Sequence, residues 1–262
     1  MSTSTAPPET GANTGRVLIE TRGLVAGYGH VPVVRGLDIS VCEGEVVCIL
    51  GANGAGKTTT LLTIAGVLPP LAGTVEVMGR PLGNKAKIHE VARRGLAIVP
   101  EGRGLFYKLT VAQNLRLRQH RQSTVDVDDV VPYFPALAKL MDRRAGLLSG
   151  GEQQMLALAG ALVADPKVVM LDEMSLGLAP IIVEQLLPTV RQIADERGMG
   201  VLLVEQHVLA ALKVADRGYV LAHGEIAAEG PASQLRHDAE LLEASYLGDE
   251  GAVHEAEESG LL

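Results

Sequence analysis

The sequence predicts an α/β protein with a central, mostly parallel β-sheet. Short, fully apolar runs at residues 46–50 and 168–171 are typical of strands that are buried on both faces. These runs alternate with longer segments of helical character, as in strand–helix–strand units. A glycine-rich loop directly follows the first run. A loop of this kind between a strand and a helix favours the same fold class.

The remaining elements are expected in a regular order. Strands are predicted at 17–24, 33–41, 46–50, 73–78, 96–99, 168–171 and 200–204, with a hairpin formed by 219–222 and 225–229. Helices are predicted at 57–67, 88–94, 181–197, 208–215 and about 232–246, and residues 111 to about 162 are mainly helical. Residues 1–15 and the acidic tail 249–262 are expected to be disordered.

The composition of the chain narrows the classes of protein to which it can belong. The 262 residues, 47% of them hydrophobic, suit one large domain or one core with a subdomain. The net charge of −8 argues against nucleic acid as the main partner. Since no apolar run is long enough to cross a bilayer and the N-terminus does not resemble a signal peptide, we expect a cytoplasmic protein. Cys42 and Cys48 could face each other in a hairpin, but reduced structural thiols are expected.

The glycine-rich loop carries the strongest functional signal. Residues 51–58 match the G-x-x-x-x-G-K-[ST] pattern, whose backbone N–H groups and helix N-terminus bind phosphate oxygens. A glycine-rich turn that binds nothing is the alternative, but such a match arises by chance in only about 1% of chains of this composition. We therefore expect a nucleoside triphosphate site formed by Gly51, Ala52, Asn53, Gly54, Ala55, Gly56, Lys57, Thr58 and Thr59.

Two carboxylates end the apolar strand at 168–171. At the edge of the sheet beside the phosphate loop, Asp172 and the hydroxyl of Thr58 can hold Mg²⁺, and Glu173 can activate the water that attacks the γ-phosphate. Buried strands often end in an acid, so this pattern is weak alone. With the phosphate loop upstream it predicts hydrolysis of a nucleoside triphosphate.

A third motif lies between the loop and these carboxylates. Residues 148–154 read L-S-G-G-E-Q-Q and precede a helical run. Alone they could be a serine-capped helix with flexible glycines or a second phosphate-binding helix N-terminus. The order of the three motifs resembles the ATP-binding cassette (ABC) ATPases over about residues 17–248. The resemblance implies a phosphate-loop cassette at 16–248, with an N-terminal antiparallel β subdomain and an inserted α-helical subdomain at about 106–162.

The same resemblance implies further roles. Ser149, Gly150 and Gly151 would close on the phosphate loop of a second subunit, so that ATP lies between two cassettes. Tyr28 would stack on adenine, and His207 would contact the γ-phosphate. Glu101 stands where most members of the family have a glutamine that contacts Mg²⁺ and the attacking water.

Several runs resemble one branch of the family, the smaller ATPase subunits of branched-chain amino acid importers. They are P-E-G-R at 100–103, S-L-G-L-A-P at 175–180, A-D-R-G-Y-V-L at 215–221 and Y-L-G at 246–248. This branch often has Asn at the position of His207, Met174 replaces a common Pro, and Gly160 stands where Arg is common in the signature helix.

The implied partners are a second cassette, either this chain or a paralogue, a transmembrane permease and indirectly a solute-binding protein. The expected location is the cytoplasmic face of the cell membrane. A urea or amide importer and an exporter ATPase remain alternatives. A soluble ABC ATPase acting on ribosomes or DNA is a less favoured one, and a GTPase is disfavoured because a guanine-reading N-K-x-D motif is missing.

Overall fold

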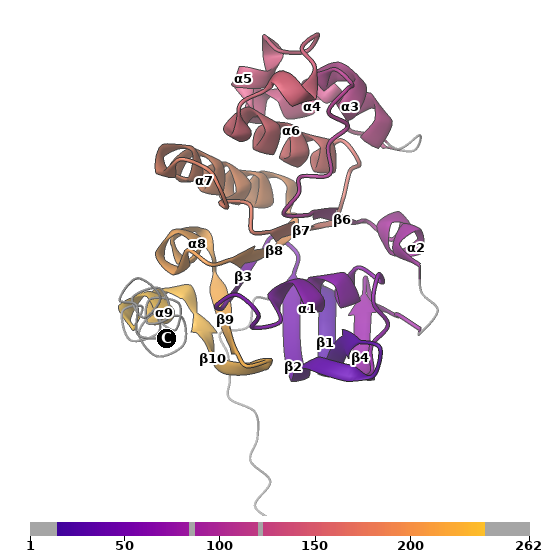
Figure 1. The fold of residues 1–262 in the computed structure, drawn as a ribbon, viewed down its shortest axis with the longest axis vertical. Coiled ribbons are helices and arrows are strands. Elements are labelled where there is room, and N and C mark those ends of the chain that lie inside the picture. The colour runs from indigo at the N-terminus through magenta and orange to yellow at the C-terminus, as the bar shows by residue number, and fades with distance from the viewer. Residues whose placement is uncertain (1–14, 84–86, 120–122, 239–262) are drawn as a thin grey trace, which may run out of the picture.

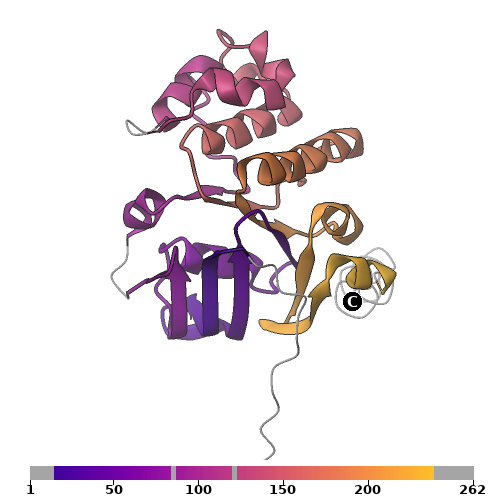
Figure 2. The same cartoon turned by 180° about the vertical axis from the view of Figure 1, so that it is seen from behind.

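The computed structural model describes residues 15–83, 87–119 and 123–238, and it contains two β-sheets (Figures 1 and 2). The larger sheet has the strand order β10-β9-β3-β8-β7-β6. Its strands are β3 (Val46–Leu50), β6 (Leu96–Val99), β7 (Val168–Asp172), β8 (Gly200–Glu205), β9 (Arg217–Ala222) and β10 (Glu225–Pro231). All neighbours pair in parallel except β10, which is antiparallel to β9. The predicted central, mostly parallel sheet is confirmed.

Hydrophobic cores cover both faces of the centre of this sheet, which explains why β3 is apolar throughout. Along β3, Val46, Cys48 and Leu50 belong to one hydrophobic core, and Val47 and Ile49 belong to another. Successive side chains of a strand point to opposite faces. A strand between two cores therefore needs apolar residues at every position.

The smaller sheet is antiparallel and has the order β2-β1-β4-β5. It contains β1 (Val17–Tyr28), β2 (Val31–Cys42), β4 (Ala72–Val77) and the two-residue strand β5 (Arg80–Pro81), which was not predicted. Helix α1 (Lys57–Ile64) places Leu61 and Ile64 in the core that this sheet shares with one face of the larger sheet. The implied antiparallel β subdomain is confirmed.

Helices cover the other face of the larger sheet and extend beyond it. Helices α3 to α6 gather at the end of the molecule farthest from the antiparallel sheet (Figures 1 and 2). The helices are α2 (Ile88–Arg93), α3 (Val111–Arg118), α4 (Val127–Val130), η1 (Val131–Tyr133), α5 (Pro135–Ala138), η2 (Ala145–Leu147), α6 (Gly150–Leu162), α7 (Pro180–Arg197), α8 (Val208–Val214) and α9 (Ala232–His237). Within the described ranges, no helix is both long enough and apolar enough to cross a membrane.

Some boundaries differ from the prediction. Helix α1 ends at Ile64 rather than at residue 67, because Gly66 has a left-handed φ of 72° and the amide of Val67 donates to the carbonyl of Leu62. Helix α9 covers only the start of the predicted last helix, and residues 239–246 lie outside the described part of the chain. The same holds for residues 1–14 and 249–262, for which disorder was predicted. Both cysteines are free and buried, as expected.

Candidate functional site

The phosphate loop (residues 51–56) joins the end of β3 to the start of α1. Its backbone needs glycine at two positions, because Gly54 has a φ of 79° and Gly56 a φ of 103°. A Cβ atom on Gly56 would also lie 2.2 Å from Cγ1 of Val34 on β2. The strand, loop and helix expected around the motif are therefore present, and the loop packs tightly against the smaller sheet.

Lys57 holds a buried positive charge under this loop. Its side chain is only 4% exposed, and its Nζ donates to the carbonyls of Gly51 at 2.9 Å and Ala52 at 3.0 Å. The same Nζ lies 3.2 Å from Oε1 of Glu173, just beyond the end of β7. A buried charge needs such partners to offset its desolvation. Lys57 is thus held at the loop and paired with the predicted catalytic carboxylate.

Asp172 is the last residue of β7 and faces the start of α1. Thr58 Oγ1 donates to Asp172 Oδ1 at 3.3 Å. The pKa of Asp172 is raised to about 6, mainly by burial and also by the charges of Glu173 and Glu101. The Thr58 hydrogen bond and the charge of Lys57 act in the opposite direction. The structure therefore brings the hydroxyl of Thr58 and the carboxylate of Glu101 close to the adjacent carboxylates of Asp172 and Glu173.

A cavity of about 460 Å³ opens beside these groups. It brings together most of the predicted nucleotide-contacting residues. Those that line it are Tyr28, Asn53, Gly54, Gly56, Lys57, Thr58, Thr59, Glu101 and Glu173. Three further lining residues, Val33, Leu176 and Gln206, were not predicted. Tyr28 is 54% exposed, so its ring is available for stacking.

The donor set of the cavity fits Mg²⁺. The hydroxyl of Thr58 and the carboxylate of Asp172 are in contact, and both are oxygen ligands of the kind that Mg²⁺ prefers. Among the described residues, no group of three or more His, Cys, Asp or Glu side chains could hold a metal ion by itself. Mg²⁺ in nucleotide sites is commonly held by few protein ligands together with phosphate oxygens. The residues present therefore suit a metal that is bound with its nucleotide.

The predicted signature residues are not part of this cavity. Ser149 is the exposed N-cap of α6. Its Oγ accepts from the amide of Glu152 at 3.3 Å, while its own amide donates to Glu152 Oε2 at 2.7 Å. Gly150 and Gly151 form the first turn of the same helix. Within one chain, this helix start and the phosphate loop do not line the same cavity.

His207 also lies outside the cavity. It is exposed at the start of α8 and lines a different groove, of about 540 Å³, between α7 and α8. The preceding residue, Gln206, lines the nucleotide cavity instead. A sequence signal for Gln206 exists, since it directly follows β8, the strand next to β7, and the carboxyl ends of parallel strands meet at one edge.

A loop at 100–104 connects the cavity to the helical end of the molecule. Arg103 donates to Oε1 of Gln154 at 3.1 Å and to Oε1 of Gln153 at 2.6 Å, both on α6. Arg118 of α3 donates to the carbonyl of Gly104 at 2.5 Å. A Cβ atom on Gly160 would lie 2.6 Å from Cδ of Arg118. The absence of a side chain at Gly160 therefore leaves the space that Arg118 occupies.

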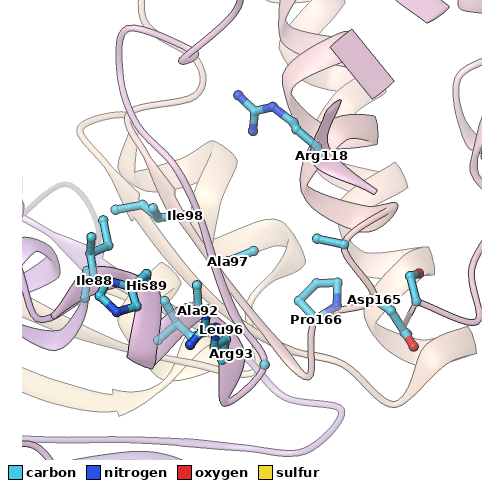
Figure 3. A pocket seen from close by; sticks show the side chains of 14 residues that line it. Ile88, His89, Ala92, Arg93, Leu96, Ala97, Ile98, Arg118, Asp165 and Pro166 are labelled. Carbon is cyan, nitrogen blue, oxygen red and sulfur yellow. The ribbon is translucent and has the colours of Figure 1, made fainter. Parts of the chain in front are cut away.

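A second, larger cleft is lined in part by Arg118. Its volume is about 920 Å³, and it is bounded by α2, β6 and the segment after α6. Figure 3 shows Arg118 across this cleft from Ile88 and His89. Burial lowers the pKa of Arg118, but its guanidinium stays charged at neutral pH. Arg118 thus borders this cleft and also holds the loop that carries Glu101.

A glycine loop at a helix start, a buried lysine under it and strand-end carboxylates around one cavity define a phosphate-loop nucleoside triphosphatase. Residues 34–175 match the family model described as ABC transporter, and the chain belongs to this family.

Curated relatives and solved structures agree with this assignment. The chain is 40% identical over 225 residues to the high-affinity branched-chain amino acid transport ATP-binding protein BraG of Pseudomonas aeruginosa, a match that covers 84% of this chain and 95% of BraG. It is 31% identical to the lipopolysaccharide export system ATP-binding protein LptB of Haemophilus influenzae, over 89% of this chain and 98% of LptB. A crystal structure of the ADP conformation of MJ1267, an ATP-binding cassette of an ABC transporter, is similar with a TM-score of 0.74 and 25% identity, over 87% of this chain and 98% of that one.

The chain is accordingly a nucleotide-binding ATPase subunit of an ABC transporter. Its predicted fold, an ABC cassette with a parallel core sheet and an antiparallel β subdomain, is confirmed.

Proposed function

We propose that the chain powers an importer for branched-chain amino acids by hydrolysing ATP on the cytoplasmic face of the cell membrane. The similarity to BraG supports this, since it spans 95% of that protein at 40% identity. The similarity to LptB, an export system subunit, is weaker at 31% identity. An importer of urea or a short amide, or an exporter, is the second candidate.

In the proposed reaction, the phosphate loop and Lys57 hold the β- and γ-phosphates. Thr58 and Asp172, with Glu101 close by, would hold Mg²⁺, which would neutralise charge on the phosphates. Glu173 accepts a proton from the attacking water and lies at the cavity to do so. Tyr28, which lines the same cavity, stacks on adenine.

The proposed working unit contains two cassettes. Ser149, Gly150 and Gly151 lie outside the cavity of their own chain, and Ser149 is exposed. Two chains that face each other would bring this helix start to the phosphate loop of the partner. The second cassette is either this chain or a paralogue. Closure on ATP and reopening after hydrolysis would drive the permease between its two orientations.

The proposed permease contact is the 920 Å³ cleft that Arg118 borders. The contact would extend to residues 101–114, which run from the loop after β6 into α3. Phe106 and Tyr107 in that segment are exposed, at 56% and 48%, as is Ile88 in the cleft, at 48%. Exposed aromatic and aliphatic side chains beside a cleft are typical of protein contact sites. A short cytoplasmic helix of the permease would suit this cleft.

The experiment is an affinity capture from solubilised membranes of the source cells. The bait is the Glu173→Gln variant with ATP and Mg²⁺, because loss of the base should hold the closed assembly. The matched control is the same variant with ADP and Mg²⁺. We expect a multi-spanning permease with ATP and less of it with ADP. A search of the neighbouring reading frames for a periplasmic binding protein would separate import from export.

Recovery of only soluble partners, such as ribosomal proteins, would contradict the transport role without affecting the ATPase chemistry. Recovery of a permease whose reconstituted form takes up urea, and not leucine or valine, would contradict the proposed substrate. Uptake of a branched-chain amino acid that depends on ATP and fails with Glu173→Gln would support the proposal in full.

A further inference from the structure

We infer that Gln206, and not His207, is the residue at the end of β8 that contacts the γ-phosphate of the bound nucleotide. Gln206 lines the nucleotide cavity, and His207 lines the groove between α7 and α8. This inference rests on the proposed function of the cavity as the ATP site. It assigns the contact to a side chain that carries no charge at any physiological pH.

The backbone around Gln206 explains this placement. The amide of Glu173 donates to the carbonyl of Val204 at 2.9 Å, so the end of β8 lies against the segment that carries the catalytic carboxylate. Gln206 follows only two residues later. It therefore enters the cavity on the side of Glu173 and Lys57. Lys57 is the residue expected at the β- and γ-phosphates.

Glu205, the last residue of β8, anchors the end of this strand through contacts in the protein interior. Its side chain is 1% exposed, and its carboxylate accepts from both the amide and the hydroxyl of Ser175. Ser175 lies in the loop directly after Glu173. Gln206 comes next, at a bend directly beyond the end of β8, and its side chain lines the nucleotide cavity. The contact of Glu205 with Ser175 therefore anchors the segment from which Gln206 reaches the cavity.

The amide of Gln206 suits a position beside the γ-phosphate and the attacking water. Its Nε2 can donate to a phosphate oxygen, while its Oε1 can accept from water. A glutamine that orients the attacking water is a known solution in phosphoryl transfer. His207, by contrast, shares its groove with Leu209 and Lys213 on α8 and Leu178 before α7.

Equilibrium binding tests the contact directly. We would titrate the full chain with AMP-PNP and Mg²⁺, which retains a γ-phosphate and is not hydrolysed, and separately with ADP and Mg²⁺. The variants are Gln206→Ala, the isosteric Gln206→Glu and His207→Ala, and Gln185→Ala on the exposed side of α7 is the matched glutamine control. A hydrogen bond to a charged group is commonly worth about a tenfold change in affinity.

We expect Gln206→Ala to weaken AMP-PNP binding about tenfold and to leave ADP binding within about twofold of wild type. Gln206→Glu should weaken AMP-PNP binding further, because a carboxylate repels the phosphate. Equal losses for AMP-PNP and ADP would indicate a structural role and overturn the inference. A loss of AMP-PNP selectivity in His207→Ala that exceeds the loss in Gln206→Ala would also overturn it.

The proposed function can fail separately. The proposed function is tested by the ATPase turnover of the Glu173→Gln variant. That turnover is measured independently of the ratio of AMP-PNP affinity to ADP affinity. Normal turnover in that variant would contradict the proposed catalytic role of Glu173 whatever Gln206 does. Loss of turnover in Glu173→Gln together with an unchanged AMP-PNP to ADP ratio in Gln206→Ala would remove only the inference about Gln206.

Discussion

The ammonium of Lys57 lies 3.2 Å from a carboxylate oxygen of Glu173, and both side chains line one cavity. Lys57 belongs to the first turn of α1, whereas Glu173 follows β7 more than a hundred residues later in the chain. The pair therefore connects phosphate binding to the candidate catalytic base. Replacement of Lys57 should therefore impair nucleotide binding, whereas replacement of Glu173 should impair hydrolysis and leave binding intact.

Replacement of Lys57 by Ala should abolish useful nucleotide binding. The variant loses the charge that faces the phosphates and leaves two loop carbonyls, those of Gly51 and Ala52, without their donor. We expect ATP affinity to fall by about a hundredfold, or ~3 kcal/mol. A titration with a fluorescent ATP analogue measures it. Lys139→Ala, on an exposed lysine after α5, is the matched control and should bind normally.

Replacement of Gly56 by Ala should destabilise the fold itself. The φ of 103° is unfavourable for alanine, and the new Cβ would lie 2.2 Å from Val34. Strain and overpacking together should lower the free energy of unfolding by about 2–3 kcal/mol. Urea unfolding of the variant provides the measurement. Gly83→Ala is the control, because a Cβ there meets nothing within 4 Å. Equal midpoints for the two variants would contradict the packing argument.

Asp172→Asn should stabilise the protein at high pH and inactivate it. In the folded protein burial raises the pKa of Asp172 from 3.8 to about 6, so its charged form is disfavoured by folding, and the cost is present above pH 6 and fades as the pH falls toward 4. Asn carries no charge and still offers an acceptor to Thr58. Because one pKa unit corresponds to about 1.4 kcal/mol, the gain at pH 8 is at most ~3 kcal/mol.

Thermal melts in EDTA at pH 8 and pH 5 test this prediction without metal. The charged groups near Asp172 are Glu173, Glu101 and Lys57, and they are unchanged in the variant. The rise in Tm should be larger at pH 8 than at pH 5. A variant that is less stable than wild type at pH 8 would show that the Asp172 charge stabilises the fold.

Arg118→Ala should disconnect the proposed permease cleft from the nucleotide site. Arg118 borders that cleft and donates to the carbonyl of Gly104, close to Glu101. We expect ATP binding to be unchanged and the stimulation of ATPase activity by the permease to fall about tenfold. Vesicles that contain the reconstituted transporter allow this measurement. Arg116→Ala, on an exposed arginine of the same helix, should keep full stimulation.

The sequence predicts the local features of the site and the topology that joins them. The loop at 51–58 is recognisable because its glycines, lysine and threonine are contiguous. The proximity of Asp172 to Thr58 follows from the meeting of parallel strands at one edge of the sheet, which the apolar runs predict. The L-S-G-G run predicts the start of α6, because serine capping is a local interaction.

The rest depends on long-range packing. Arg118 enters the space above Gly160 from another helix, and Arg103 pairs with Gln153 and Gln154 across 50 residues. No local pattern encodes these contacts. Gln206 and His207 are neighbours in the sequence, yet they line different cavities beyond the anchored residue Glu205. A motif read from sequence gives the segment but not the side chain that faces the cavity.

The most direct test of the account is the turnover of Glu173→Gln, measured beside its affinity for ATP. If Glu173 is the base, steady-state ATPase activity should fall by about a hundredfold to ten-thousandfold, because a glutamine cannot accept the proton of the attacking water. ATP affinity should stay within about twofold, since Lys57 and the phosphate loop are retained. Wild-type turnover in this variant would contradict the assignment of Glu173 and of the Lys57–Glu173 cavity as the site of hydrolysis.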